Sequence, residues 1–123
     1  CAATFRVTDA YDRMGMRLDG CKLTLREVLS IPSEPIVRGA IQVSGDGIPT
    51  VLLADHQTTG GYPKIATIIS CDTDRIAQHR SGQDLRFSVI SGPSFLKIAG
   101  QGIDRLGCVP NRHTTKKPPK KVR

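Results

Sequence analysis

Six short apolar runs, separated by turn-forming residues, dominate the pattern of this sequence. They predict β-strands over Thr4–Thr8, Met16–Leu18, Ala40–Val43, Thr50–Ala54, Ile65–Ser70 and Leu85–Ile90. The segments LDGC, SGDGIP, TTGGYP and RSGQD each combine glycine with Asp, Ser, Thr or Pro, the residues of tight turns. Strands this close in sequence leave no room for the crossover helices of a parallel sheet. The pattern favours a mainly β fold, a closed or nearly closed barrel, over the alternative of a sandwich.

Two short helices complete the predicted fold. One covers Thr24–Leu29 and ends ahead of Pro32, because proline disfavours a helical residue before it. The other covers Thr73–Arg80 and stops at Gly82. The segment FLKIAGQGIDRL, in the stretch from 91 to 110, is expected to form a broken helix if it is helical.

The net charge of +7 is concentrated at the C-terminal end. Six basic residues and no acidic one lie between Arg112 and Arg123. The prolines and the lack of apolar periodicity in HTTKKPPKKVR predict a disordered basic tail over 111–123, which leaves 1–110 as one barrel domain. No aromatic residue interleaves with the lysines for base stacking. This favours a solubilising tail over one that binds RNA or an anionic membrane.

The cysteines and histidines indicate the compartment. Cys1, Cys21, Cys71 and Cys108 form no CxxC pair, and the three histidines are not at metal-ligand spacing. There is no signal peptide and no apolar span of about 18 residues. We therefore expect a cytoplasmic protein with free thiols and no metal, in which Cys71, directly after the run IATIIS, is buried. The chain starts at Cys1 without a methionine and enters a predicted strand at once, so we expect a piece of a longer protein.

The connection from Asp55 to Lys64 has more hydrogen-bonding capacity than a hairpin needs. A plain hairpin uses about two to five connecting residues, whereas DHQTTGGYPK contributes an amide, hydroxyls, two glycines and a cation. Gly60 and Gly61 would let the backbone approach a ligand and offer N–H groups. The segment has no GK[ST] of a phosphate-binding P-loop. The composition suits a planar amide or carboxylate and any oxyanion that develops from it.

Two other stretches have both a structural and a functional interpretation. YDRMGMRLDG is typical of a strand-turn-strand in which Gly15 supplies a bulge and Asp12 pairs with an arginine. Its two arginines would instead be able to clamp a carboxylate or phosphate. Gln42 lies inside an apolar strand, where a buried amide needs partners or a ligand. Asp46 lies between glycines, as an ordinary turn residue or a site residue.

The segments DRMGMRL, GAIQVSGDGIPTVLLADHQTTGGYPKIATI and DRIAQ occur in the order seen in a known family. The chain resembles the allophanate hydrolase subunit 2 family, also described as the biotin-dependent carboxyltransferase family or the family of the 5-oxoprolinase C subunit, and is similar to the carboxyltransferase domain of urea carboxylase. The resemblance runs roughly from Phe5 to Ile90. It implies a cyclophilin-like β-barrel that forms the C-terminal part of a subunit. The implied partners are the N-terminal part of that subunit and a companion, subunit-1-like barrel. Carboxybiotin would be carried by a partner, and ATP would be used by the complex.

The resemblance also implies a set of ligand-binding residues, without a catalytic residue or a metal. They are Arg13, Gln42, Asp46, Gln57, Thr58, Thr59, Gly60, Gly61, Tyr62 and Lys64. In this interpretation the glycines donate N–H groups, Gln57 and the threonines orient an amide, and Lys64 or Arg13 holds negative charge. Two positions depart from the family pattern. Ser44 stands where proline is common, and His56 stands where arginine is usual, which weakens carboxylate or carboxybiotin binding because histidine is mostly uncharged at neutral pH.

Three hypotheses follow. The first is a domain of a biotin-dependent carboxyltransferase or an ATP-dependent 5-oxoprolinase subunit, which binds a urea-like amide or a lactam at Asp55–Lys64. The alternative is a non-catalytic regulatory barrel that binds a partner subunit or a kinase inhibitor, favoured because no obvious nucleophile and base stand out. The third is RNA binding by the tail, which would weaken steeply with salt.

Overall fold

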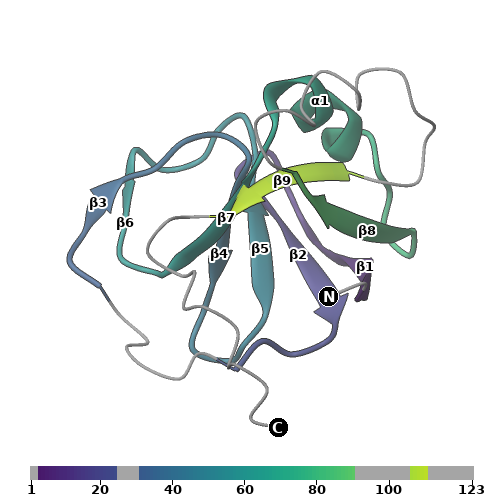
Figure 1. Cartoon of the computed structure of the whole chain (residues 1–123), viewed down its shortest axis with the longest axis horizontal. Helices are drawn as coiled ribbons and strands as arrows, with labels where there is room; N and C mark the ends of the chain where they lie inside the picture. The colour runs from purple at the N-terminus through teal and green to yellow at the C-terminus, as the bar shows by residue number, and fades with distance from the viewer. Residues whose placement is uncertain (1–2, 25–30, 91–105, 111–123) are drawn as a thin grey trace, which may run out of the picture.

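Seven strands of the computed structural model curl into a closed barrel (Figure 1). The structure describes residues 3–24, 31–90 and 106–110. Around the barrel the strands follow the order β1 (Thr4–Tyr11), β2 (Gly15–Gly20), β5 (Pro49–Leu52), β4 (Ala40–Val43), β7 (Lys64–Ile68), β9 (Leu106–Pro110) and β8 (Asp84–Val89). The pairing of β1 with β8 closes the sheet, and β8 with β9 is its parallel pair. Closure leaves the sheet without open edges, and the expectation of a mainly β barrel is confirmed.

A two-stranded ribbon stands beside the barrel, at the left in Figure 1. It consists of β3 (Glu34–Pro35) and β6 (Thr59–Gly60), which pair antiparallel. The N–H of Ile36 extends the ribbon by donating to the Thr58 carbonyl at 3.1 Å. Part of the connection between Asp55 and Lys64, Thr59–Gly60, therefore folds as a strand against the segment before β4. Two-residue strands carry no periodic signal, and the sequence pattern predicted neither of them.

The interior of the barrel is filled by alternate residues of the strands. The buried cluster consists of Phe5, Val7, Met16, Leu18, Ile41, Val51, Leu53, Ala66, Ile68, Ile76 and Leu85. Period-two alternation puts these side chains on the inner face and their sequence neighbours on the outer face. A second, smaller cluster of Ile36, Ala40 and Leu52 lies on the outer face, where the ribbon joins β4 and β5. The outer face is therefore partly apolar as well.

One helix of the described residues, α1 (Ser70–Ala77), packs at the end of the barrel. It corresponds to the predicted Thr73–Arg80 helix but begins three residues earlier, and Ile76 inserts fully buried into the barrel cluster. Because the helix starts at Ser70, Cys71 lies on its solvent side, and the expectation that this cysteine is buried is wrong. The other predicted helix, Thr24–Leu29, falls almost entirely outside the described residues.

The segment after residue 90 differs from its prediction where it is described. Residues 106–110 form β9, which pairs with β7 on one side and β8 on the other. The rest of FLKIAGQGIDRL and the predicted tail over 111–123 lie outside the described residues. Within the described ranges, no helix is long and apolar enough to cross a membrane.

Two methionines of the first hairpin test the barrel core. Met16 is 0% exposed inside the barrel, whereas Met14 is 43% exposed at the turn. Met16→Ala should lower the free energy of unfolding by roughly 2–5 kcal/mol, because it leaves a cavity among packed side chains. Met14→Ala, the matched control, should change it by less than about 0.5 kcal/mol. Urea unfolding followed by circular dichroism measures both, and equal losses would contradict the assignment of Met16 to the core.

Candidate functional site

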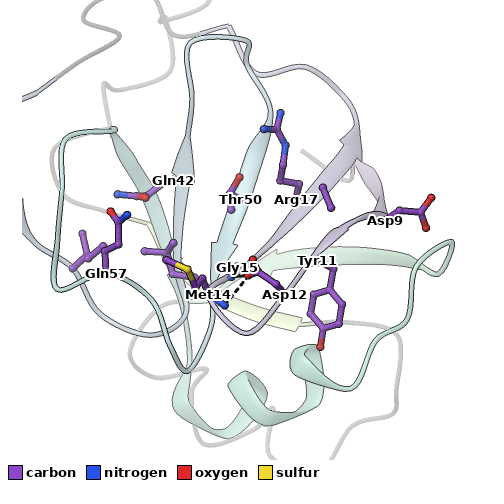
Figure 2. A pocket seen from close by; sticks show the side chains of 12 residues that line it. Asp9, Tyr11, Asp12, Met14, Gly15, Arg17, Gln42, Thr50 and Gln57 are labelled. Carbon is purple, nitrogen blue, oxygen red and sulfur yellow. Dashed lines mark hydrogen bonds between the residues drawn. The ribbon is translucent and has the colours of Figure 1, made fainter.

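An open pocket of about 520 Å³ lies on the outer face of β2, β5 and β4 (Figure 2). It is lined by Asp9, Ala10, Tyr11, Asp12, Met14, Gly15, Arg17, Ile36, Gln42, Thr50, Leu52 and Gln57. The residues contributed by β2, β5 and β4 point outward because their sequence neighbours fill the barrel interior. The turn between β1 and β2 forms one rim of the pocket. The start of the connection to β6 forms the opposite rim.

Three polar side chains form a row across the floor of this pocket. Gln42 is the Cα partner of Thr50 in the β4–β5 pair, and Arg17 is the partner of Thr50 in the β2–β5 pair. Side chains directly opposite each other on one face have Cβ atoms about 4.5–5.5 Å apart. The register therefore puts an amide, a hydroxyl and a guanidinium side by side on the outer face, as Figure 2 shows.

An irregularity in strand pairing occurs on each side of the row. The β1–β2 register shifts between Val7 and Tyr11, and the β4–β7 register shifts between Ile41 and Gln42. Bulges of this kind re-aim side chains and are common beside functional sites. The first shift brings the end of β1 to the rim of the pocket, where the Tyr11 hydroxyl donates to the Ala77 carbonyl of α1 at 2.6 Å. The rim is thus tied to the helix.

Gln42 is the most deeply placed polar residue of the row. It is only 8% exposed, and its Nε2 donates to the Tyr62 carbonyl over a long 3.5 Å. The amide fits against the ribbon because residue 60 is glycine, and a Cβ there would come within 2.8 Å of the Gln42 Nε2. Within the described residues, no hydrogen bond reaches the Gln42 Oε1. A nearly buried amide with an open acceptor at a pocket is suited to bind a ligand.

Gln57 supplies a second amide from the opposite rim. It is exposed and lines the same pocket, and Figure 2 shows its side chain directed toward Gln42. Its carbonyl lies 2.5 Å from the Nδ1 of His56, so the neighbouring histidine contacts the backbone of this rim. Of the residues predicted to bind ligand, the structure brings Gln42 and Gln57 together in the pocket.

The predicted cations Arg13 and Lys64 lie outside the pocket lining and contact carboxylates of the chain itself. The Nε of the exposed Arg13 is 2.8 Å from the Asp55 carboxylate. The Nζ of Lys64, largely buried, lies 3.0 Å from the Glu34 carboxylate and donates to the Pro35 carbonyl at 3.0 Å. Arg13 thus ties the first turn to the start of the connection, and Lys64 ties β7 to the ribbon.

The remaining predicted residues of this connection belong to the ribbon. Thr59 and Gly60 pair with β3, and the carbonyls of Thr58 and Gly61 accept N–H groups from the segment before β4. Tyr62 is 51% exposed, and its carbonyl is the acceptor for the Gln42 amide. The hydrogen-bonding capacity of the connection therefore holds a strand in place and contributes one wall beside the row.

Asp46 lies in the β4–β5 turn and reaches the pocket through Arg17. Its carboxylate accepts the Ser44 hydroxyl at 2.5 Å and the Ile48 N–H at 3.2 Å, and it lies 2.8 Å from the Arg17 Nη2. The Ser44 hydroxyl above all, then the Ile48 N–H and the Arg17 guanidinium, lower the pKa of Asp46 to about 2. Asp46 is therefore a permanent anion at neutral pH that holds Arg17.

Arg17 was absent from the predicted ligand-binding set, although the sequence contains a signal for it. It lies two positions after Gly15, so period-two alternation places the two residues on one face of β2. This face lines a pocket because β2 pairs with β5, and no local sequence pattern indicates that pairing.

Two acidic residues at the rim stabilise turns. The Asp12 Oδ1 accepts the N–H groups of Met14 and Gly15 at 2.8 and 3.0 Å, in place of the expected pairing with an arginine. The Asp9 carboxylate accepts the Ser81 hydroxyl. In the described part of the chain, no three of His, Cys, Asp and Glu gather as a metal site.

Comparison with known proteins identifies the family. Residues 1–89 match the family model described as carboxyltransferase domain, subdomain A and B. The chain belongs to this carboxyltransferase-domain family. It is 46% identical over 80 residues to the 5-oxoprolinase C subunit of Haemophilus influenzae and 39% identical over 93 residues to that of Escherichia coli. These alignments cover 65% and 76% of this chain but 26% and 30% of the relatives, so the chain spans less than a third of their length.

Solved structures show a similar fold. Crystal structures of TTHA0988 in two space groups are 39% identical to this chain, with TM-scores of 0.58 and 0.59. Each covers 69% of this chain and 17% of its own chain. The resemblance to the family of the 5-oxoprolinase C subunit, drawn from the sequence motifs, is confirmed by these matches.

The turn that holds Arg17 can be tested by titration. Ser44→Ala should raise the pKa of Asp46 from about 2 toward its ordinary value of 3.8, because the largest contribution to the shift is lost. Carboxyl-carbon NMR measures this directly. The pKa of Asp46 is lower in the folded chain, so its contribution to stability is present above the unfolded pKa and is lost as pH falls toward about 2. The stability difference between Ser44→Ala and the unaltered protein should shrink over that range.

The control for this titration is Ser81→Ala, which removes the hydroxyl that contacts Asp9 instead. It should leave the titration of Asp46 unchanged. An unaltered pKa of Asp46 in Ser44→Ala would contradict the assigned cause.

Proposed function

We propose that this chain is a domain of a carboxyltransferase or 5-oxoprolinase-type subunit and that its pocket binds a small amide or lactam. The observation that carries the proposal is Gln42, an almost buried amide whose Oε1 is open toward the pocket on the outer barrel face. The relatives are named as the C subunit of 5-oxoprolinase, and 5-oxoproline is a lactam, a cyclic amide. A glutamine side chain complements an amide because each offers one donor and one acceptor edge.

The pocket supplies both polar and apolar contacts for such a ligand. The Gln42 Oε1 would accept the ligand N–H, while the Thr50 hydroxyl and the Gln57 amide would donate to the ligand carbonyl. Ile36 and Leu52, buried together on the outer face, would pack against a small ring. This division follows the usual composition of small-molecule sites, which are mostly apolar with a few convergent polar groups.

The reaction itself would need groups from outside the described residues. The lining of the pocket contains no Ser, Cys, His or Lys among the residues that the structure describes, and its two carboxylates, Asp9 and Asp12, hydrogen-bond to Ser81 and to the turn backbone. We propose that these groups come from the rest of its subunit and from a companion subunit, since the relatives are named as subunits of a 5-oxoprolinase. Amide binding as proposed uses neither carboxybiotin nor ATP within this pocket. A cytoplasmic location follows from the sequence expectations and belongs to the same proposal.

The first experiment is substrate-dependent ATP turnover by the complete subunit, assembled with its partner subunits. 5-Oxoproline and urea are offered separately. Turnover that depends on one of them supports the enzyme proposal and identifies the amide. If neither supports turnover in a folded, assembled complex, the alternative of a regulatory barrel is favoured.

Variants of the two glutamines then test the site. Gln57→Ala, at an exposed position, should lower kcat/KM by about 10-fold or more, because a hydrogen bond to the ligand is lost. Gln42→Met keeps the shape of the side chain without its amide and should do the same or more. Gln78→Ala, at the exposed end of α1, is the matched control and should leave turnover unchanged. Unchanged kcat/KM in both pocket variants would exclude this site.

A further inference from the structure

Arg17 lines the pocket, and part of its guanidinium has N–H groups available to a ligand. Its Nη2 contacts the Asp46 carboxylate at 2.8 Å. Within the described part of the chain, its Nε and Nη1 make no hydrogen bond. A guanidinium presents five N–H donors in a planar fork, which matches the two oxygens of a carboxylate. Arg17 can therefore keep its internal partner and still bind an anion.

The internal partner fixes the position of the guanidinium. Ser44 and Ile48 hold the Asp46 carboxylate within the β4–β5 turn, through the Ser44 hydroxyl and the Ile48 N–H. The carboxylate in turn holds one side of Arg17, a side chain that is 42% exposed and would otherwise sample many rotamers. Preorganisation of this kind lowers the entropy lost when a ligand binds.

The acidic residues of the pocket do not occupy the available side of Arg17. Asp12 is directed to the backbone of its own turn, and Asp9 bonds to Ser81. In Figure 2 Asp9 lies at the far side of the pocket from Gln42 and points away from the row, whereas Asp12 lies beside Met14 and Gly15 at the turn. Along the row, Thr50 separates the Arg17 guanidinium from the Gln42 amide.

We propose that Arg17 is the residue that binds the ligand carboxylate in this pocket, so that it selects amides or lactams that carry a carboxylate over uncharged ones. This inference rests on the proposed function and specifies the class of ligand at the same site. The amide of the ligand lies toward Gln42 and its carboxylate toward Arg17. Urea and other uncharged amides can hydrogen-bond to Gln42 but offer no carboxylate to Arg17. Ser44 and Asp46 are positioning residues that act through Arg17.

The test compares two ligands that share a lactam ring. 5-Oxoproline carries a carboxylate, and 2-pyrrolidinone lacks it. Binding to the complete subunit is measured by isothermal titration calorimetry or equilibrium dialysis. The unaltered subunit should prefer 5-oxoproline by about 10-fold or more, the range that a charge-assisted hydrogen bond supplies. Arg17→Gln should lower the affinity for 5-oxoproline by about 10- to 100-fold and change that for 2-pyrrolidinone by less than about twofold.

The matched control is Arg38→Gln. Arg38 is 39% exposed and pairs with Asp74 at 2.7 Å, much as Arg17 pairs with Asp46, but it lies outside the pocket lining. Its replacement should leave both affinities unchanged. Equal effects of Arg17→Gln on the two ligands, or no effect on either, would overturn the inference while the proposed function stands. Failure of the unaltered subunit to bind either ligand overturns the proposed function and this inference with it.

Ser44→Ala separates positioning from direct contact. It should reduce the preference for 5-oxoproline over 2-pyrrolidinone by less than Arg17→Gln does. The same variant should also raise the pKa of Asp46, because both effects follow from loss of the Ser44 hydroxyl. Ser44→Thr keeps the hydroxyl and should retain the preference. A preference that stays unaltered in Ser44→Ala, while the pKa of Asp46 rises, would overturn the positioning role.

Discussion

The alternation of side chains in a closed barrel is the constraint on which the rest of this structure depends. Inward residues such as Met16 and Val51 fill the interior, so their neighbours Arg17 and Thr50 must face outward. On most of a barrel such outward residues would meet water. Here the segment around Ile36 and the rim from β1 rise on either side of β2, β5 and β4, and the outward face becomes the floor of a pocket.

Two ion pairs hold the connection before β7 beside the floor of the pocket. Lys64 with Glu34 and Arg13 with Asp55 fasten the connection to the ribbon and to the first turn. The Arg13–Asp55 pair is exposed, and exposed ion pairs contribute little to stability by themselves, typically below about 1 kcal/mol. Together with the backbone hydrogen bonds of the ribbon, the two ion pairs hold the wall beside Gln42 in place. The connection thus shapes the site mainly through its backbone.

Some of the site was accessible from local sequence and some was not. Gln42 was identified because an amide inside an apolar strand needs a partner, and the structure places it nearly buried at the pocket. Arg17 was considered as one of two arginines that would clamp an anion but was left out of the predicted set, because its place in the pocket depends on Thr50 across a strand pair and on Asp46, which lies 29 residues away. For the fold, Ala40–Val43 was predicted with its observed bounds. The strand β9 was missed because it is defined by pairing with β7 and β8, which precede it by many residues.

The sequence by itself determined the apolar alternation, the turn positions and the family, since these are properties of neighbouring residues or of ordered motifs. Tertiary structure alone decided which polar side chains meet. The spatial order β2–β5–β4 brings Arg17, Thr50 and Gln42 into one row although the chain visits β4 before β5. It also turned Arg13 and Lys64 toward carboxylates of the chain itself. The physical reason is that strand pairing is a long-range choice, made by the packing of the whole barrel.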